Sequence, residues 1–252
     1  MKIAVVTGAS SGMGKEFVLQ ISREKKLDEI WVIARRADRL EALQNEVSTK
    51  IRPISLDLTL NESIESYRKL LETEQPDVRV LMNASGFGRF GKFEDTDLDV
   101  MLNMIDLNDK AYVAMTYVTL PFMHEGGEIY QLDSLSSFQP VPYIGVYGAT
   151  KAFVLSFSRA LNVELKSRKI KVMAVCPGWV KTEFFDHAVK DDTIVYYNKF
   201  FTSEQVITRA LRDMRKGKDV SVCGFSIRAQ VLLTKLLPHR IVMKIWCKQQ
   251  KK

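Results

Sequence analysis

Residues 3–14 of the 252-residue chain read Ile3-Ala4-Val5-Val6-Thr7-Gly8-Ala9-Ser10-Ser11-Gly12-Met13-Gly14. The β-rich run Ile3–Thr7 predicts a buried strand, and the amphipathic pattern after the last glycine predicts a helix. Glycines between a strand and a helix permit a tight turn and let the backbone approach a pyrophosphate, which the helix N-terminus attracts. We therefore expect the following residues to bind the phosphates of a dinucleotide: Gly8, Ser10, Ser11, Gly12, Met13 and Gly14.

The same turn has a second interpretation. Gly8-Ala9-Ser10-Ser11-Gly12 also fits G-x-S-x-G, the nucleophile elbow of α/β-hydrolases, which likewise joins a strand to a helix. In that fold one N–H group of the oxyanion hole comes from a loop earlier in the chain. Only seven residues precede Gly8. We therefore expect a phosphate-binding turn, although its spacing G-x-x-x-G-x-G differs from the commoner G-x-G-x-x-G.

Short apolar runs alternate with amphipathic segments along the rest of the chain. The expected strands are Ile3–Thr7, Ile30–Ala34, Ile51–Leu56, Val78–Asn83, Glu128–Asp133, Ile170–Cys176 and Val220–Val222. The expected helices are Gly14–Lys26, Arg39–Ser48, Ser63–Glu74, Asp97–Met123, Val146–Arg168 and Ser203–Lys216. This alternation predicts an α/β fold with a doubly wound, Rossmann-type parallel sheet of about seven strands. We expect one domain over residues 1–252, with a substrate loop at 183–202 and a basic tail at 238–252.

The end of the second strand bears on the choice of cofactor. NAD-binding sites carry an acidic residue near this point for the ribose 2′-hydroxyl, whereas a 2′-phosphate favours arginine. Here the strand ends in Arg35-Arg36, and Asp38 resembles a helix N-cap whose partner is Glu41. We therefore expect NADP(H), held by Arg35 and Arg36.

A tyrosine and a lysine four residues apart, Tyr147 and Lys151, lie on the expected helix Val146–Arg168. Positions i and i+4 share one face of a helix. A lysine cation near a tyrosine favours the phenolate and lowers a pKa that is ordinarily about 10. Ser134, which follows the strand Glu128–Asp133, is placed to hold a substrate oxygen. These residues form a candidate acid–base site.

Taken together, these motifs resemble the classical short-chain dehydrogenase/reductase family along nearly the whole chain. The turn Thr7–Gly14 is similar to the family's cofactor turn, and Ser134 precedes Tyr147 by the family's spacing of 13 residues. Asp133 and Ala84 depart from the pattern, because the family often has serine and asparagine there. The other matching segments are Asp57-Leu58, Asn83-Ala84-Ser85-Gly86, Asn108 with Ala111, and the turn Pro177, Gly178, Val180 and Thr182.

The resemblance implies roles for these residues. Tyr147 exchanges the proton of the substrate hydroxyl, and Ser134 orients the substrate oxygen. Lys151 holds the nicotinamide ribose and lowers the tyrosine pKa, while Asn108 anchors a proton-relay water. The remaining matches line the cofactor site. A hydride then passes between NADP(H) and a carbonyl or secondary alcohol.

The segments expected at the carboxyl ends of the strands are rich in aromatic side chains, which suggests a bulky apolar substrate such as a hydroxysteroid or another large ketone. The three histidines have no metal-ligand spacing, so we expect no metal. A cofactor-sensing or tail-docking protein on the same fold, with little turnover, is the alternative. The aromatic residues are Phe87, Phe90, Phe93, Phe138, Tyr143, Trp179, Phe184, Phe185, Tyr196 and Tyr197, and the histidines are His124, His187 and His239.

The net charge of +7 arises in the tail. Residues 226–252 hold seven basic residues and no acidic one, so the body is balanced and a nucleic-acid partner is not expected. After Pro238, basic and apolar residues follow a helical period. We expect this helix to pack on the substrate loops or a neighbouring subunit, with docking to an anionic membrane as the alternative. We expect a homo-oligomer. Three scattered cysteines and no signal segment predict a cytoplasmic protein.

Overall fold

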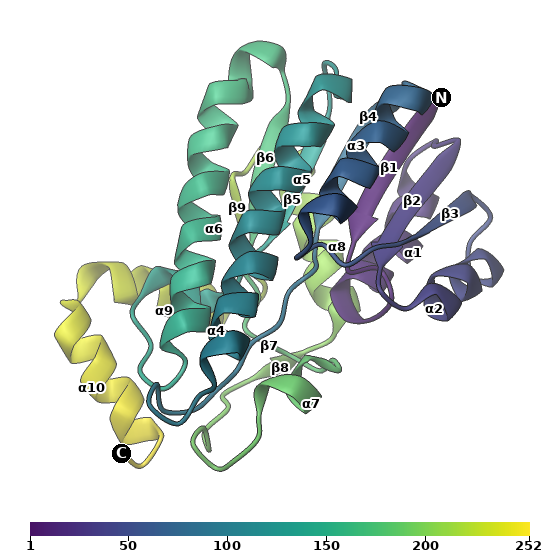
Figure 1. Ribbon diagram of the computed structural model, residues 1–252. Coiled ribbons are helices and arrows are strands. Elements are labelled where there is room, and N and C mark those ends of the chain that lie inside the picture. Colours follow the sequence, from purple (N-terminus) through teal and green to yellow (C-terminus); the bar gives the residue numbers. More distant parts are fainter.

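The computed structural model describes residues 1–252 and has one central sheet of seven parallel strands (Figure 1). The strand order is β3-β2-β1-β4-β5-β6-β9. The chain adds β2 and β3 on one side of β1 and then returns to pair β4 with the other side of β1. This is the predicted doubly wound sheet. Such a reversal opens a crevice at the carboxyl ends of the strands. The strands are β1 Lys2–Thr7, β2 Glu29–Ala34, β3 Lys50–Ser55, β4 Asp77–Asn83, β5 Glu128–Leu132, β6 Lys171–Val175 and β9 Val220–Ser221.

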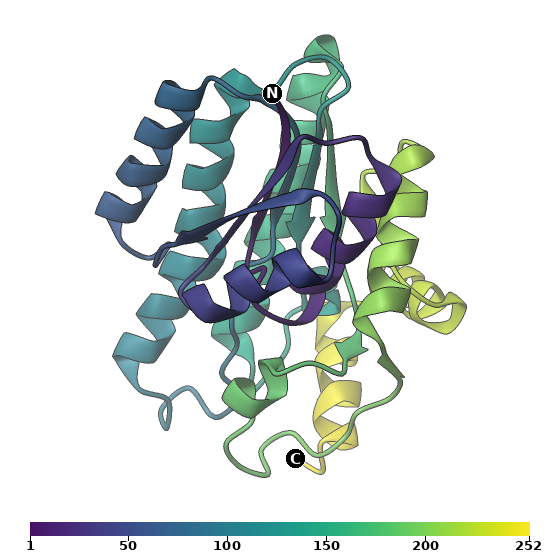
Figure 2. The same cartoon turned by 90° about the vertical axis from the view of Figure 1, so that its right-hand side faces the viewer.

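The sheet is covered by helices on both faces, as Figure 2 shows. Side chains alternate between the faces of a strand. In β1, Ala4 and Val6 therefore enter the core beneath α1, α2 and α8, while Ile3 and Val5 enter the core beneath α3, α5 and α6. All four are fully buried. The covering helices are α1 Gly12–Glu24, α2 Ala37–Ala42 and α8 Ser203–Arg215 on one face, and α3 Asn61–Glu74, α5 Ala111–Thr119 and α6 Gly145–Glu164 on the other.

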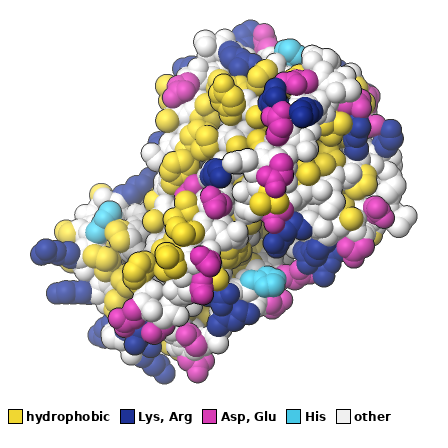
Figure 3. Space-filling view, viewed as in Figure 1, with side chains coloured by type: hydrophobic (Ala, Val, Ile, Leu, Met, Phe, Trp, Pro, Cys, Tyr) yellow, Lys and Arg dark blue, Asp and Glu magenta, His cyan; other side chains and the backbone are white.

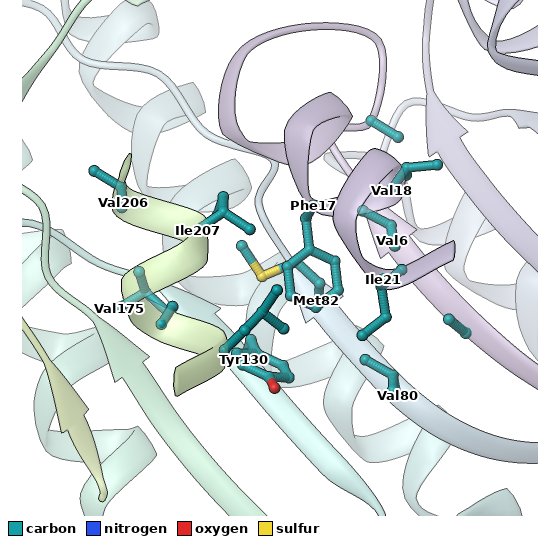
Figure 4. Close-up of a cluster of buried hydrophobic side chains, with 14 of the residues drawn as sticks. Val6, Phe17, Val18, Ile21, Val80, Met82, Tyr130, Val175, Val206 and Ile207 are labelled. Carbon is teal, nitrogen blue, oxygen red and sulfur yellow. The ribbon is translucent and has the colours of Figure 1, made fainter. Parts of the chain in front are cut away.

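The core on the α1 and α8 side is closely packed (Figure 4). The rings of Phe17 in α1 and Tyr130 in β5 meet edge to face, with centroids 4.9 Å apart. Ile207 and Val206 of α8 extend the same cluster. Burying each large apolar side chain stabilises the fold by about 1.5–3 kcal/mol. This packing fixes the helix α1 that follows the glycine turn.

The expected helix Asp97–Met123 is interrupted by one wider turn. Asp97 caps its start, because its carboxylate accepts from the N–H groups of Asp99 and Val100 at 2.8 and 3.3 Å. The π-helical turn contains Asn108, and such turns are frequent at functional sites. The segments are α4 Leu98–Ile105, the π turn Asp106–Lys110, α5 and the 3₁₀ turn Leu120–Phe122.

The predicted helix Arg39–Ser48 is wrong in its limits and in its cap. α2 begins at Ala37 after Arg36, so Asp38 lies inside the first turn and makes no capping hydrogen bond. There its carboxylate still faces the positive end of the helix dipole. The helix ends at Ala42 and is followed by the 3₁₀ turn Leu43–Asn45.

The remaining elements gather at the carboxyl ends of the strands. The expected tail helix is present as α10, which begins after Pro238, whereas α9 has no counterpart among the expected helices. No helix combines the length and apolar character that a membrane crossing requires. These elements are β7 Trp179–Val180, α7 Phe184–Ala188, β8 Phe200–Phe201, α9 Phe225–Leu236, α10 His239–Gln249, and the 3₁₀ turn Leu135–Phe138. A further 3₁₀ turn, Leu165–Arg168, lies elsewhere, between the end of α6 and the amino end of β6.

Candidate active site

The glycine turn between β1 and α1 has no space for a side chain at Gly8 or at Gly14. Gly8 has φ +64°, and a Cβ there would lie 2.6 Å from the carbonyl oxygen of Ala84. A Cβ on Gly14 would lie 2.3 Å from the oxygen of Gly8. The Thr7 hydroxyl accepts from the N–H groups of Ala84 and Ser85 at 2.9 and 3.1 Å, which ties the ends of β1 and β4 together. Only glycine permits this approach.

The turn borders a cleft of about 830 Å³. Asn83 does not line it: its amide donates to the side-chain oxygens of Gln131 and Thr116 at 2.9 and 3.1 Å inside the core. Asn83 therefore supports the end of β4 from within. The predicted cofactor residues that do line the cleft are Gly8, Ser10, Ser11, Gly12, Met13, Gly14, Arg35, Arg36, Asp57, Leu58, Ala84, Ser85, Gly86 and Thr182.

The two arginines after β2 differ in their contacts. The Nη2 atom of Arg36 donates to the hydroxyls of Ser10 and Ser11 at 2.9 and 3.0 Å, which holds its guanidinium against the glycine turn. The side chain of Arg35 is 75 % exposed and lies 3.9 Å from a carboxylate oxygen of Asp57. Arg36 is thus the arginine fixed at the phosphate-binding turn.

Two residues that the sequence analysis missed complete this corner. The carboxylate of Glu183, just before α7, accepts from Arg36 at 2.9 Å and from Arg39 at 2.6 Å. These hydrogen bonds lower the pKa of Glu183. Positions 36 and 39 are one helical turn apart, a spacing that indicates a shared face. No local pattern points to Glu183. The corner holds an anion between two guanidinium groups.

Tyr147 and Lys151 lie on one face of α6, and both are almost fully buried. The Nζ atom of Lys151 donates to the carbonyl oxygen of Leu132 at 2.9 Å and lies 5.8 Å from the centroid of the Tyr147 ring. Burial lowers the pKa of Lys151, although Asp133 and Asp109 raise it. Helix α6 therefore places the two predicted residues next to each other.

The tyrosine pKa differs from the expectation that Lys151 lowers it. Burial raises the pKa of Tyr147 above its usual range, the Ser134 hydroxyl lowers it, and Asp133 raises it. The Lys151 ammonium is directed at Leu132 instead. In this state Tyr147 holds its proton at neutral pH and is poised as a general acid.

Asn108 is fully buried beneath the loop that follows β4. Its side-chain oxygen accepts from the N–H of Phe87 at 3.1 Å, and its amide donates to the oxygen of Phe87 at 3.0 Å and to the hydroxyl of Thr150 at 3.1 Å. A Cβ on Gly86 would meet the Asn108 oxygen at 2.8 Å. Asn108 therefore fixes the 86–87 backbone beside α6. Its role with a relay water stays a prediction.

Asp133 and Ser134 follow β5. The Ser134 hydroxyl accepts from the N–H of Ser136 at 3.2 Å and borders a second cavity. Asp133 is buried, accepts from the Cys176 thiol at 3.2 Å, and leaves its other oxygen without a hydrogen-bond partner. Burial raises the pKa of Asp133 to about 7, and Lys151 opposes this rise. The residue that departs from the family pattern is a second titratable group beside Lys151.

The second cavity measures about 440 Å³ and is mostly apolar in its walls. Ser134, Tyr147 and Lys151 lie in its wall with Pro177, Gly178 and Val180. Aromatic rings approach the tyrosine, with centroids 5.5 Å away for Phe184 and 6.1 Å for Phe90. The two cavities are adjacent, because both are lined by Met13, Ala84, Gly86, Leu132, Thr182 and Phe184.

Helix α10 closes one side of this second cavity. Trp246 donates to the carbonyl oxygen of Pro142 at 3.0 Å, and Val242 is buried. The side-chain oxygen of Gln250 accepts from the N–H groups of Val195 and Tyr196, both at 2.9 Å. The tail thus packs on the substrate loops, as expected. No group of three metal-ligating side chains occurs in the structure.

Comparison with known proteins gives the class of the molecule. The family model described as short chain dehydrogenase matches residues 2–193. The chain belongs to the short-chain dehydrogenase/reductase family and is an oxidoreductase.

Individual relatives agree with this assignment. An uncharacterized oxidoreductase of Staphylococcus epidermidis is 31% identical over 183 residues, which cover 72% of this chain and 79% of that protein. An NADP-dependent 3-hydroxy acid dehydrogenase of Schizosaccharomyces pombe is 33% identical over 192 residues, 73% of each chain. A short-chain dehydrogenase from Sphingobium yanoikuyae in complex with NADPH superimposes with a TM-score of 0.79 at 26% identity and 92% coverage of both chains.

Proposed function

We propose that the protein transfers a hydride between NADP(H) and a bulky apolar ketone or secondary alcohol, with Tyr147 as the general acid or base. The observation that carries the proposal is the meeting of the two cavities. The cleft with the glycine turn and the apolar cavity share a wall that includes Leu132 and Phe184. The buried Lys151 donates to the carbonyl oxygen of Leu132, and the ring of the buried Tyr147 packs near Phe184.

The residues of the cleft fit a dinucleotide. Gly8 and Gly14 leave the backbone bare where a Cβ would clash, and the N-terminus of α1 faces the same cleft. Backbone N–H groups at a helix N-terminus bind phosphate. Gly86 and Thr182 line both cavities, so a nicotinamide ring next to them would border the substrate cavity. We assign the pyrophosphate to the turn and the nicotinamide ribose to Lys151.

Three observations support NADP(H) over NAD(H). Arg36 is held against Ser10 and Ser11, and with Arg39 it already binds a carboxylate, so this corner binds anions. β2 ends in Ala34 followed by Arg35, with no acidic residue to accept a ribose hydroxyl. The relatives from S. pombe and S. yanoikuyae are described with NADP or NADPH.

The chemistry assigned to the chain is proton transfer and positioning. When bound, the nicotinamide supplies or accepts the hydride. In reduction the Tyr147 hydroxyl donates its proton to the carbonyl oxygen, and in oxidation the phenolate removes the proton of the alcohol. Ser134 donates a hydrogen bond to the same oxygen, and the Lys151 cation stabilises the phenolate.

The walls of the second cavity indicate the substrate. Aromatic and aliphatic side chains predominate, and the cavity has space for a molecule of several rings or a long chain. Lys151 is the only cation in the wall of the second cavity, and we assign it to the cofactor ribose and to Tyr147. Apolar ketones therefore fit better than phosphorylated sugars.

We further propose that the chain forms a homo-oligomer. Leu98, Leu102 and Ile105 form an exposed apolar stripe on α4, and Tyr117 on α5 is also exposed. Exposed apolar patches of this kind mark protein interfaces. Light scattering should give a mass that is a multiple of 28.8 kDa, and a monomer at micromolar concentration would contradict the proposal.

A cofactor and substrate screen tests the proposed function. The purified chain is mixed with NADPH or NADH and a panel of ketones that ranges from small and polar to polycyclic, and the absorbance of the reduced nicotinamide is followed. We expect turnover that prefers NADPH and increases with the apolar surface of the ketone. Absence of turnover with every ketone and alcohol, despite NADPH binding, would favour the cofactor-sensing alternative.

A further inference from the structure

The last two helices expose several large apolar side chains. On α9, side chains at positions i, i+4, i+7, i+8 and i+11 face outward, so one side of this helix is apolar along its length. The opposite side carries the buried Ile227 and Thr234. The outward residues, which we call the tail surface, are Phe225, Ala229, Leu232, Leu233 and Leu236 on α9 and Ile241 and Ile245 on α10.

The charged side chains of the tail itself have one sign. Residues 226–252 carry seven basic side chains and no acidic one, and none of the seven forms an ion pair in the structure. In Figure 3, dark blue side chains project from the edge that α10 forms, and hydrophobic side chains lie among them. The seven are Arg228, Lys235, Arg240, Lys244, Lys248, Lys251 and Lys252.

The proposed substrate cavity opens at the same place. Leu233 and Ile245 line that cavity and are also exposed, so they form its rim within the tail surface. An apolar molecule that reaches the cavity at this rim passes over the tail surface. This link to the cavity rests on the proposed function, whereas the exposure and the charge do not.

We propose that the tail surface docks the protein on the surface of a lipid bilayer that contains anionic lipids. Helices with exposed apolar side chains and basic flanks lie in the interface between head groups and acyl chains. Each basic residue near an anionic surface adds to the attraction. A second copy of this chain is a poor occupant, because a symmetric contact would oppose two sets of seven unpaired cations.

Docking is tested by co-sedimentation of the full chain with vesicles, which needs no enzymatic readout. We expect the protein to pellet with vesicles of phosphatidylglycerol and phosphatidylcholine at low salt. It should stay in the supernatant with phosphatidylcholine alone, and about 0.5 M NaCl should release it because salt screens exposed charges. Equal binding to both vesicle types, or none to either, would overturn the proposal.

Two pairs of matched variants separate the apolar and the cationic contributions. Leu232→Ser with Leu236→Ser removes tail-surface residues that do not line the cavity, and Val163→Ser removes a side chain that is 72 % exposed, like Leu236, from α6. We expect the first variant to lose vesicle binding at least about tenfold and Val163→Ser to keep it.

The second pair reverses charges. Lys244→Glu with Lys248→Glu should weaken binding to anionic vesicles at least about tenfold. Lys26→Glu with Lys166→Glu makes the same change in net charge near the amino ends of the strands and should leave binding intact. Equal losses in both would show an effect of net charge alone and contradict docking through the tail.

Activity separates this proposal from the proposed function. Turnover of a water-soluble ketone without vesicles should be the same in wild type and in all four variants, which also shows that each is folded. The wild-type protein could fail to bind vesicles but form an oligomer that the Leu232 and Leu236 changes disrupt. This result would assign the tail surface to self-association and overturn docking. An inactive chain that still binds anionic vesicles would contradict only the proposed function.

Discussion

Arg36 and Glu183 are 147 positions apart in the chain, yet the Arg36 Nη1 atom donates to a carboxylate oxygen of Glu183 at 2.9 Å. Arg39 holds the other oxygen at 2.6 Å. Glu183 directly precedes α7, whose Phe184 packs near the Tyr147 ring. The carboxylate therefore occupies the arginine corner that we assign to the 2′-phosphate, and it links this corner to the helix above the acid–base site.

Glu183→Gln should tighten NADPH binding, because it removes a carboxylate that competes with the phosphate for Arg36 and Arg39. The two side chains are 40% and 42% exposed, so the gain should be modest, about three- to tenfold in Kd. Fluorescence titration with NADPH and NADH measures it. Weaker NADPH binding in the variant would indicate that Glu183 contacts the cofactor directly and contradict the competition.

Arg36→Ala should weaken NADPH binding about 10- to 100-fold and change NADH binding little, because charge-assisted hydrogen bonds to phosphate are lost. Arg35→Ala is the matched control, and we expect it to have a smaller effect since this side chain extends into solvent. The ratio of kcat/KM with NADPH to kcat/KM with NADH, measured for both variants and wild type, tests this prediction. A larger change in the Arg35 variant would indicate that Arg35, and not Arg36, binds the 2′-phosphate.

Asp133→Asn should change how stability depends on pH. Burial raises the pKa of Asp133 from 3.8 to about 7, so between these values the folded chain binds more protons than the unfolded chain. Its contribution to the free energy of unfolding therefore falls as pH rises from about 4 to 7. Over this pH range we expect the free energy of unfolding to decrease by about 1–3 kcal/mol less in the variant than in wild type. Urea unfolding at a series of pH values measures it, and parallel curves for the two proteins would contradict the buried, protonated carboxyl.

Gln250→Ala should loosen the substrate loop, because it leaves the N–H groups of Val195 and Tyr196 without their acceptor. We expect a rise in KM, a small change in kcat, and a loss of about 1–3 kcal/mol in the free energy of unfolding. Gln250→Glu keeps the acceptor oxygen and should behave more like wild type. Equal KM values in the alanine variant and wild type would show that the tail does not shape the substrate site.

Local patterns account for the parts of the fold that the sequence predicts. The run Ile3–Thr7 is buried on both faces, and the glycine turn follows it directly, so strand, turn and helix were all predictable from neighbouring residues. The same holds for Tyr147 and Lys151, whose spacing on α6 brings them to one face.

Other features depend on contacts between distant segments, which no local pattern records. The ion pair of Glu183 with Arg36 and Arg39 and the hydrogen bonds of Gln250 with the 195–196 backbone are of this kind. The Asp38 cap failed for another reason: α2 begins two residues earlier than predicted, after Arg36, so Asp38 lies inside the first turn. The sheet order likewise places Asn83 inside the core beside Gln131.

The central claim is that Tyr147 transfers the proton that accompanies the hydride. Tyr147→Phe keeps the ring that packs near Phe90 and Phe184 and removes only the hydroxyl. Kinetics with NADPH and the best ketone of the screen, together with NADPH binding by fluorescence, give the test. We predict that kcat falls by about 10²–10⁴-fold while the Kd for NADPH changes little. A variant that turns over the ketone at the wild-type rate would contradict the account.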